Sequence, residues 1–292
     1  KGIIGMRASL AAAVRIQCVA SRSSFLLGLL AFCLSVIPVR AEELPLYDGE
    51  RVSYDLYFKW GVLMPRAGTA YFDMRTATWE GKNAWHYRLL FHTTGMIDRF
   101  FPMRDTLNTY LDGADARVLF SSKRTDEGDY YLIDDLRFRY DKPSEVAAHS
   151  LRTHWEQVKV DTTLTAEGLA FDMLGGAFYL RSLDWERMTL GQVYPFCIFI
   201  GRDVVKAQFR YTGQQVVTRG DLRYRTRHFY IDIFDEAFTQ AKEAAEVWMG
   251  DDENRLPIRV RAKLKIGAAE VYLREAERTR YPLRCRVTVP EK

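Results

Sequence analysis

Apolar and polar residues alternate along most of the chain. Apolar side chains occupy every second position in residues 52–58, 68–74, 85–91, 136–140 and 258–266. Alternation with a period of two is typical of antiparallel strands that turn one face to a core and the other to water or a ligand. Turn-forming residues, mainly Gly, Asp and Asn, separate the alternating segments. The pattern therefore predicts a mainly β protein of roughly a dozen strands.

One segment departs from this alternation. Asp172 can cap a helix that runs to about Trp185, with apolar residues at helical spacing. The helix divides the chain into an N-terminal β lobe (42–170), a connecting helix (171–188) and a C-terminal β lobe (189–292). Because no Pro-, Ser- or Gly-rich linker separates the lobes, we expect one continuous structure. The predicted fold is a large curved antiparallel sheet or open barrel with one internal helix.

Residues 1–41 have the features of a secretory signal peptide. They carry five basic residues and no acidic one, and residues 25–39 form an uncharged apolar run. This run is shorter than the roughly twenty residues that span a bilayer as a helix. A basic region, a short apolar run and the small residue Ala41 follow one another in the order of a signal peptide. We therefore expect an exported protein whose mature chain begins near Glu42, with an uncleaved N-terminal anchor as the alternative.

The positive charge of the chain belongs to this leader. The full sequence has 42 basic and 38 acidic residues and a net charge of +4. Removing residues 1–41 leaves 37 basic and 38 acidic residues, a net charge of −1. A near-neutral exported chain without a recognition motif argues against nucleic acid as a partner. No later segment is long and apolar enough to span a bilayer, so we expect no transmembrane segment in the mature chain.

The sequence lacks the short motifs of the common catalytic and cofactor sites. It has no phosphate-binding glycine loop, zinc-protease motif, hydrolase nucleophile elbow or CxxC pair. Its five histidines are poorly spaced for one ion, since His86 and His92 would lie roughly 20 Å apart on a regular strand. The sequence therefore predicts neither a metal site nor a cofactor.

Two cysteines, Cys197 and Cys285, remain in the expected mature chain. In an oxidising compartment they could form a disulfide. Cys197 lies in the apolar segment 195–200, so two buried free thiols are the alternative.

Arginines recur at every second position in two predicted strands. Arg223, Arg225 and Arg227 share one face of the first strand, and Arg259 and Arg261 share one face of the second. If the strands belong to one sheet, the five side chains form a basic stripe that can bind carboxylates or phosphates. The alternative is a solvated outer face on which the arginines pair with nearby glutamates.

The opposite face of the first of these strands carries His228 and Tyr230. Residues two apart on a strand have side chains roughly 6–7 Å apart on the same face. With a nearby arginine, such a pair could catalyse β-elimination of an acidic polysaccharide, because arginine would neutralise the uronate and His or Tyr would move the proton. A packed aromatic stripe without catalytic function is the alternative.

Four segments together resemble a known family. They are YDGERVSYDLYFKWGVLMPRAGTAYFDM, MRDTLNTYLD, DMLGGAFYLRSLDW and VWMGDDENRLPIRVRAKLKIGAAEVYL. They are similar to the exported bacterial domain-of-unknown-function family 3108, from about Leu46 to Leu273. The resemblance implies the envelope of a Gram-negative bacterium, in the periplasm or at the periphery of the outer membrane. The closing hairpin is also similar to the curved sheets of periplasmic lipoprotein carriers, at the level of fold only.

The sequence favours a non-catalytic envelope protein that binds an apolar or anionic ligand, such as a lipid, an acyl chain or a glycan. The basis is an aromatic-rich β chain, with 16 Tyr, 17 Phe and 6 Trp, that lacks a catalytic signature. Two alternatives remain. One is a lyase-like enzyme that acts on acidic polysaccharide. The other is a structural or assembly partner of an outer-membrane complex, which predicts a large exposed apolar patch.

Overall fold

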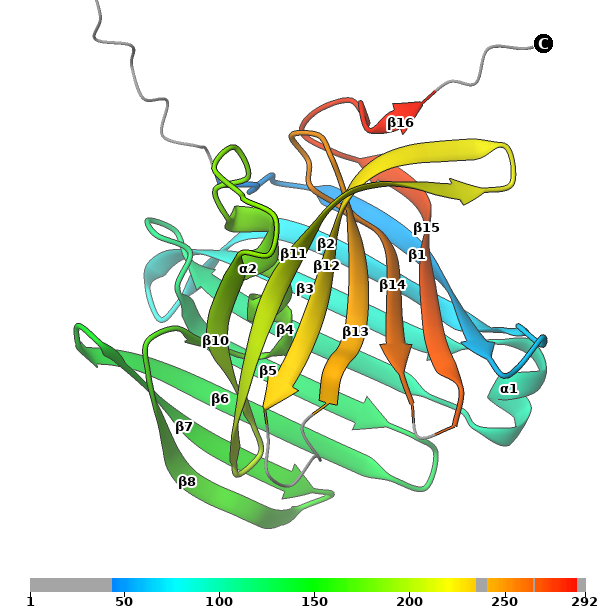
Figure 1. The fold of residues 1–292 in the computed structure, drawn as a ribbon. Coiled ribbons are helices and arrows are strands. Elements are labelled where there is room, and N and C mark those ends of the chain that lie inside the picture. Colours follow the sequence, from blue (N-terminus) through cyan, green and yellow to red (C-terminus); the bar gives the residue numbers. More distant parts are fainter. Residues whose placement is uncertain (1–43, 235–240, 265, 288–292) are drawn as a thin grey trace, which may run out of the picture. The chain divides into compact units, whose positions relative to one another are not determined.

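The computed structural model describes residues 44–234, 241–264 and 266–287 (Figure 1). The described residues form one compact unit. The expected signal peptide, residues 1–41, lies outside the described residues, so export stays a prediction. None of the helices in the described part of the chain is long and apolar enough to cross a membrane.

The first half of the chain supplies eight strands and a short helix. The strands are β1 (Glu50–Lys59), β2 (Arg66–Trp79), β3 (Lys82–Thr93), β4 (Arg104–Asp112), β5 (Val118–Asp126), β6 (Tyr131–Lys142), β7 (Glu145–His154) and β8 (Gln157–Glu167). Helix α1 (Gly95–Phe100) lies between β3 and β4. This helix was not predicted from the sequence, because six residues are too few to show a helical period.

The second half supplies the remaining strands and the internal helix. The elements are β9 (Ala170–Phe171), α2 (Met173–Ser182), β10 (Val193–Ile200), β11 (Asp203–Arg219), β12 (Leu222–Phe234), β13 (Ala241–Gly250), β14 (Pro257–Lys263), β15 (Ala268–Arg278) and β16 (Arg286–Val287). Helix α2 confirms the predicted cap, because the Asp172 carboxylate accepts hydrogen bonds from the backbone N–H groups of Leu174 and Gly175. The helix is shorter than expected, because the backbone becomes extended at Leu183, and the Arg255 guanidinium donates to the carbonyls of Arg181 and Leu183 there.

All the strands belong to one sheet. The order is β8-β7-β6-β5-β4-β3-β2-β1-β15-β14-β13-β12-β11-β10-β9, and β16 adds to β12. Neighbouring strands are antiparallel except β9 and β10, which are parallel. Strand β1 pairs with β15, with Tyr54 opposite Leu273, so the two β-rich halves continue into one another. The large curved antiparallel sheet predicted from the sequence is thereby confirmed, and it is nearly closed.

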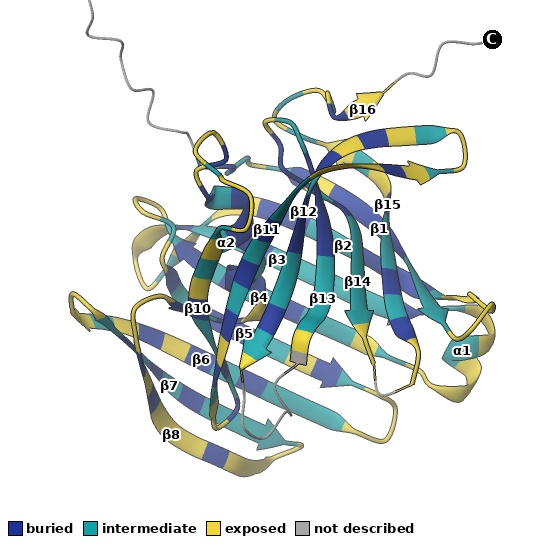
Figure 2. Ribbon diagram, in the orientation of Figure 1, coloured by how far each residue is buried: buried dark blue, intermediate teal, exposed yellow. Residues whose placement is uncertain are grey.

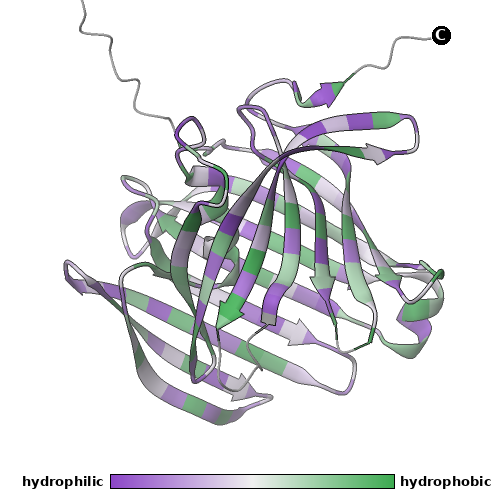
Figure 3. Ribbon diagram, in the orientation of Figure 1, coloured by the Kyte–Doolittle hydropathy of each residue, from purple (hydrophilic) through white to green (hydrophobic). Residues whose placement is uncertain are grey.

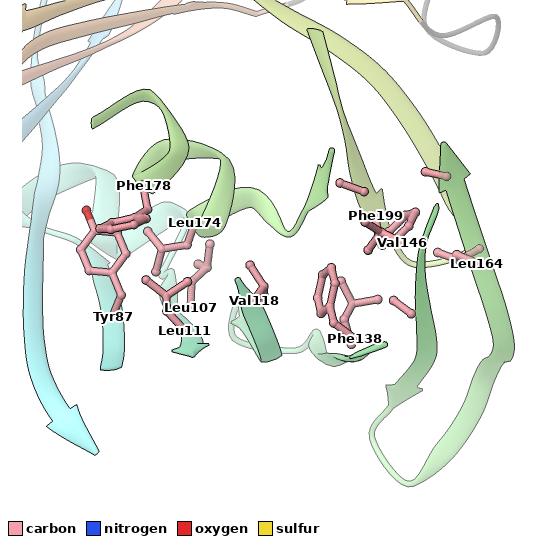
Figure 4. Close-up of a cluster of buried hydrophobic side chains, with 14 of the residues drawn as sticks. Tyr87, Leu107, Leu111, Val118, Phe138, Val146, Leu164, Leu174, Phe178 and Phe199 are labelled. Atoms are coloured by element: carbon pink, nitrogen blue, oxygen red, sulfur yellow. The ribbon is translucent and has the colours of Figure 1, made fainter. Parts of the chain in front are cut away.

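The curvature brings the two ends of the sheet together through side chains. The Ser150 hydroxyl on β7 donates a hydrogen bond to the carbonyl of Gly201, in the turn after β10. One hydrophobic cluster contains Val146 of β7, Leu164 of β8 and Phe199 of β10, and Figure 4 shows these three side chains facing one another. The barrel-like shape therefore rests on apolar packing between strands that are not hydrogen-bonded neighbours.

The alternation seen in the sequence corresponds to two faces of the sheet. Hydrophilic and hydrophobic positions alternate along the strands in Figure 3, and the buried positions in Figure 2 follow the same rhythm. On β7, for example, Val146, Ala148 and Ser150 are buried and the residues between them are partly exposed. Helix α2 lies inside the curve, where Leu174 and Phe178 pack with Tyr87 (Figure 4).

Candidate functional site

A cavity of about 430 Å³ lies inside the curved sheet. Its strand walls come from both halves of the chain and are apolar: Tyr54, Leu56, Ala70, Phe72, Leu89, Phe91, Leu107, Phe196, Ile198, Phe209, Ile231, Val247, Met249, Pro257, Val260 and Val271. Helix α2 adds Met173, Gly176, Ala177 and Leu180. The volume falls in the range of roughly 300–1,000 Å³ that small-molecule sites occupy, and such sites are mostly apolar.

A row of three valines forms one wall of the cavity. Val247, Val260 and Val271 are cross-strand partners on β13, β14 and β15. Partners that lie directly opposite one another share a face, so the register of these three strands turns all three side chains to the cavity. The alternation along each strand places an apolar residue on the inner face, and the pairing between strands brings the three valines into one row.

Helix α2 closes one side of the cavity because its first turn packs closely on β5. A Cβ added to Gly175 would lie 2.7 Å from a methyl group of Val118 and 2.7 Å from Oδ1 of Asp172. Glycine is therefore required at this close approach. At Gly176, which lines the cavity, an added Cβ would find its nearest atom at 3.6 Å, an ordinary contact. The second glycine leaves space in the cavity without being required by packing.

Asp105 and Lys123 are the charged residues that line the cavity. Asp105 is the second residue of β4, and Lys123 lies three residues before the end of β5, so both lie toward the same end of the sheet. Burial raises the pKa of the Asp105 carboxyl above its usual value, and the charge of Lys123 opposes that rise. The cavity therefore combines long apolar walls with one pair of opposite charges at one end.

The predicted basic stripe is not formed. Strands β12, β13 and β14 do share a sheet, but Arg227 is paired with Met249, whereas Arg259 is paired with Trp248, the neighbour of Met249. Adjacent residues of a strand point to opposite faces, so Arg227 and Arg259 lie on opposite sides of the sheet. Arg223 and Arg225 follow the parity of Arg227 and are exposed on the hairpin of β11 and β12.

The arginines on the outer face are paired with acidic side chains. This agrees with the alternative interpretation of the sequence, in which the arginines pair with nearby glutamates. Arg259 donates two hydrogen bonds to the carboxylate of Glu270, at 2.9 and 3.0 Å. Arg261 lies 3.6 Å from Glu246 and 3.5 Å from Glu270. Arg227, on the inner side, pairs with a carboxylate as well, that of residue 251, at 2.8 Å. These contacts give Arg227, Arg259 and Arg261 a structural role in the sheet.

His228 and Tyr230 share a face of β12, as predicted, with ring centroids 4.9 Å apart. His228 nevertheless lies beneath the neighbouring side chains of the outer face, and it is only 2% exposed. Its Nδ1 contacts the hydroxyl of Thr212, and its Nε2 lies 3.4 Å from Glu246. Burial lowers the pKa of His228, and the charge of Glu246 opposes that change. A polymer on the surface cannot reach this imidazole, so the arrangement matches the packed stripe.

A row of stacked side chains that was not predicted from the sequence crosses the outer face of the sheet. The His228 ring lies 4.6 Å from that of Trp248, and the Arg259 guanidinium lies 4.4 Å from the Trp248 ring and 5.4 Å from that of Tyr272. The guanidinium of Arg219, the last residue of β11, lies 4.7 Å from the Tyr272 ring and extends the row. Cation–π contacts of this kind stabilise a sheet, typically by about 0.5–2 kcal/mol each.

Cys197 and Cys285 are free thiols, so the disulfide that the sequence allowed is not formed. Cys285 is fully buried in one hydrophobic cluster, whereas Cys197, on β10, packs against another. Burial raises the pKa of both thiols, which keeps them protonated and poorly reactive. In the described part of the chain, no three His, Cys, Asp or Glu side chains are grouped in a way that could hold a metal ion.

Comparison with known proteins assigns the chain to a family. The sequence of residues 53–274 matches the family described as protein of unknown function (DUF3108). The chain belongs to this family. The resemblance noted in the sequence is thereby confirmed, over nearly the same span. Among curated proteins, none matches the sequence.

One solved structure shows the same fold at low sequence identity. A β-barrel-like protein of domain-of-unknown-function family DUF1849 from Brucella abortus is 11% identical, with a TM-score of 0.52 over 79% of this chain and 97% of that chain. This similarity concerns the fold alone. A protein from Bacteroides fragilis, described as exported and YmcC-like in fold, is 8% identical over 80% of this chain and 97% of that one. Its TM-score of 0.30 is too low to support an argument.

Proposed function

We propose that this DUF3108 protein is a non-catalytic binding protein of the cell envelope that holds the acyl chain of a lipid in its internal cavity. The observation that carries the proposal is the cavity of about 430 Å³, whose lining is apolar except for Asp105 and Lys123. A largely apolar site with few polar groups is typical of ligand pockets. The lining includes no histidine, serine or cysteine beside Asp105 and Lys123, so it lacks the side chains of the common nucleophile–base pairs, which favours binding over catalysis.

The chemistry of the lining favours a chain over a compact polar ligand. Burying an acyl chain contributes about 0.8 kcal/mol for each methylene group. Two additional methylenes therefore strengthen binding by more than tenfold, as long as the cavity has room for them. Lys123, toward one end of the cavity, can pair with a carboxylate or a phosphate. The proposed ligand is thus amphipathic, with its chain among the valines and its anionic group near Lys123.

The location in the envelope is part of the same proposal. The leader of residues 1–41 supports export, and the proposed destination is the periplasm or the periphery of the outer membrane. N-terminal sequencing of the protein recovered from an envelope fraction tests this part. A mature N-terminus near Glu42 is expected, and a protein that retains residues 1–41 would contradict cleavage.

Native mass spectrometry of the mature chain, purified from an envelope fraction, tests the cavity directly. We expect an added mass that organic extraction releases as a lipid. A delipidated sample should then bind an environment-sensitive fluorescent fatty acid, with affinity rising as the chain lengthens. If the protein carries no added mass and binds no fatty acid of any length, the proposal is wrong.

A matched pair of substitutions assigns binding to the cavity. Val260→Phe replaces an isopropyl group in the cavity wall by a larger phenyl ring. The ring should exclude two or more methylenes of the fatty acid from the cavity and weaken its binding by about tenfold or more. Val158→Phe makes the same change at an exposed position of β8 and should leave binding unchanged. Equal binding by both variants would show that the fatty acid binds elsewhere. Thermal unfolding of Val260→Phe, recorded alongside, separates lost folding from lost binding.

A further inference from the structure

Exposed apolar side chains gather at one end of the curved sheet. This end carries the β1–β2 turn, helix α1 between β3 and β4, and the β14–β15 turn. The register places the three segments side by side, because Lys59 is paired with Ala268 and Gly68 with Thr93. Figure 1 shows α1 beside the tip that joins β1 and β2.

The β1–β2 turn presents four apolar side chains to the solvent. Trp60, Val62, Leu63 and Met64 are all exposed, and Val62 is completely so. Trp60 and Leu63 exchange backbone hydrogen bonds of 2.9 and 3.0 Å across the turn, which fixes its shape. Gly61 has a positive φ of 57°, a conformation that glycine adopts without strain. The turn is therefore an ordered, convex and apolar tip.

Helix α1 extends the same surface. Met96 is 77% exposed, and Phe100 and Phe101 at the other end of the helix are exposed to a similar extent. The backbone N–H of Thr94 donates a hydrogen bond of 3.0 Å to the carbonyl of Ala67, which ties the start of the helix to the start of β2. The helix buries none of its own residues, so it contributes little to the core.

The β14–β15 turn completes the surface with Leu264 and Ile266, which are both exposed. Gly267 lies directly against β1, since an added Cβ would be 2.2 Å from the carbonyl oxygen of Lys59. The exposed apolar side chains of these three segments (residues 60–64, 96–101 and 264–266, without residue 265) are called the apolar rim below. Exposed apolar side chains gathered on neighbouring segments in this way mark an interaction site.

The charges around the apolar rim are predominantly positive. The described residues of 59–66, 95–104 and 263–268 include five basic side chains and one acidic side chain, Asp98. Three of the basic side chains have carboxylate partners: Arg104 pairs with Asp98 at 2.6 Å, Arg66 pairs with Asp55 at 2.8 Å, and Lys263 lies 3.9 Å from Glu243. Lys59 and Arg99 have no ion-pair partner among the residues that the structure describes. Basic side chains around an apolar surface complement a partner that carries anionic groups at its surface and an apolar interior below them.

We propose that the apolar rim docks this protein on an anionic phospholipid bilayer. Tryptophan is enriched at membrane interfaces, and basic side chains near an anionic surface contribute about 1 kcal/mol each. The rim projects as convex tips, which suits insertion among lipid headgroups. Asp105 and Lys123 lie toward the same end of the sheet, so a docked protein would present the charged end of its cavity to the bilayer. The docking surface stands on its own observations and does not require the cavity to bind lipid.

Sedimentation with lipid vesicles tests the rim, using the chain from Glu42 so that the leader cannot contribute. Vesicles of equimolar phosphatidylglycerol and phosphatidylcholine should pellet the protein, and high salt or pure phosphatidylcholine should reduce the bound fraction. Leu63→Ser should lower the partition coefficient by roughly tenfold. The control is Leu190→Ser, at a comparably exposed leucine on the opposite end of the sheet, which should stay within about twofold of the wild type.

Each outcome decides the inference. If the protein does not pellet with the anionic vesicles, the inference is wrong, and the rim instead fits the contact surface of a protein partner. If Leu63→Ser and Leu190→Ser reduce binding equally, the rim does not carry the contact and the inference is again wrong. Both leucines are exposed, so equal thermal unfolding of the two variants is expected and verifies that they fold.

The vesicle assay and the cavity assay fail independently. Leu63→Ser should still bind the fluorescent fatty acid in vesicle-free buffer, because Leu63 does not line the cavity. Val260→Phe should still pellet with anionic vesicles. Loss of fatty-acid binding alone would overturn the proposed function, and loss of vesicle binding alone would overturn the docking surface.

Discussion

Substitution of Glu50 by Gln should strongly destabilise the protein, because it leaves Arg181 as an unpaired charge in the interior. The side chains of Arg181 on α2 and Glu50 on β1 are 2% and 3% exposed. Two parallel hydrogen bonds of 2.7 and 2.8 Å join them, and Arg181 also donates to the carbonyl of Asn254 at 3.0 Å. The pair therefore connects the end of α2, a wall of the cavity, to β1 and to the turn before β14.

The magnitude follows from the burial of both partners. Removing one member of a buried ion pair typically destabilises a protein by about 3–5 kcal/mol. Gln keeps the size of Glu50 and one acceptor oxygen, so we expect a loss near the lower limit, about 3 kcal/mol. For a chain of this size, each kcal/mol lowers the melting temperature by roughly 2–4 °C, so the expected decrease is about 6–12 °C.

Urea unfolding, followed by circular dichroism, measures the change. Replacing both partners, by Glu50→Leu and Arg181→Met together, should be much less destabilising than Glu50→Gln, because no buried charge is left. Glu80→Gln breaks the exposed pair with Arg137 and should change the stability by less than about 1 kcal/mol. The reasoning is refuted if Glu50→Gln is as mild as Glu80→Gln, or if the double replacement is as unstable as the single one.

Two further predictions concern the first turn of α2. Burial raises the pKa of Asp172 from its usual value to about 6, so the folded state holds a proton between pH 4 and 6 that the unfolded state has released. Stability should therefore fall as the pH rises through this window, by at most about 3 kcal/mol, and Asp172→Asn should flatten the decline in urea-unfolding curves; equal slopes would contradict the assignment. Gly175→Ala should destabilise by about 1–3 kcal/mol because its Cβ meets a valine methyl of β5 and Oδ1 of Asp172, whereas Gly176→Ala should stabilise by about 0.5–1 kcal/mol. Thermal melts of the two alanine variants that shift in the same direction would contradict this reasoning.

The strands could be predicted from the sequence because each one carries its own signal. Alternation along residues 52–58 depends only on local spacing, and so does the cap at Asp172. Helix α1 has no comparable signal. Its apolar residues face solvent, so their spacing reflects the rim and follows no packing period.

The face of each arginine could not be predicted, because it depends on pairing between strands. Arg227 lies on β12 and Arg259 on β14, and the strand between them, β13, determines which faces of the sheet the two side chains occupy. An irregularity in the pairing of β13 with β14, between Trp248 and Met249, changes the register there. A shift of one residue moves a side chain to the opposite face. For the same reason the stacked row of Trp248 and Arg259 was invisible in the sequence.

The cavity was still harder to foresee, because it exists only where distant strands face one another. Ala70 and Val260 line the same cavity although they are far apart in the chain. The composition indicated an aromatic-rich interior. Whether the aromatic side chains fill the space inside the sheet or leave a cavity depends on how tightly the sheet curves. The curvature in turn depends on contacts between strands that are not neighbours, such as Ser150 with Gly201.

An open apolar cavity also constrains how the rest of the protein must be stabilised. The apolar side chains that line an unfilled cavity lack the packing partners that a filled core would give them. The outer row through Trp248 and Arg259 and the buried pair of Glu50 and Arg181 supply contacts that do not occupy the cavity. A ligand that fills the space restores part of the missing packing, so binding should raise the melting temperature, and by more for a longer acyl chain.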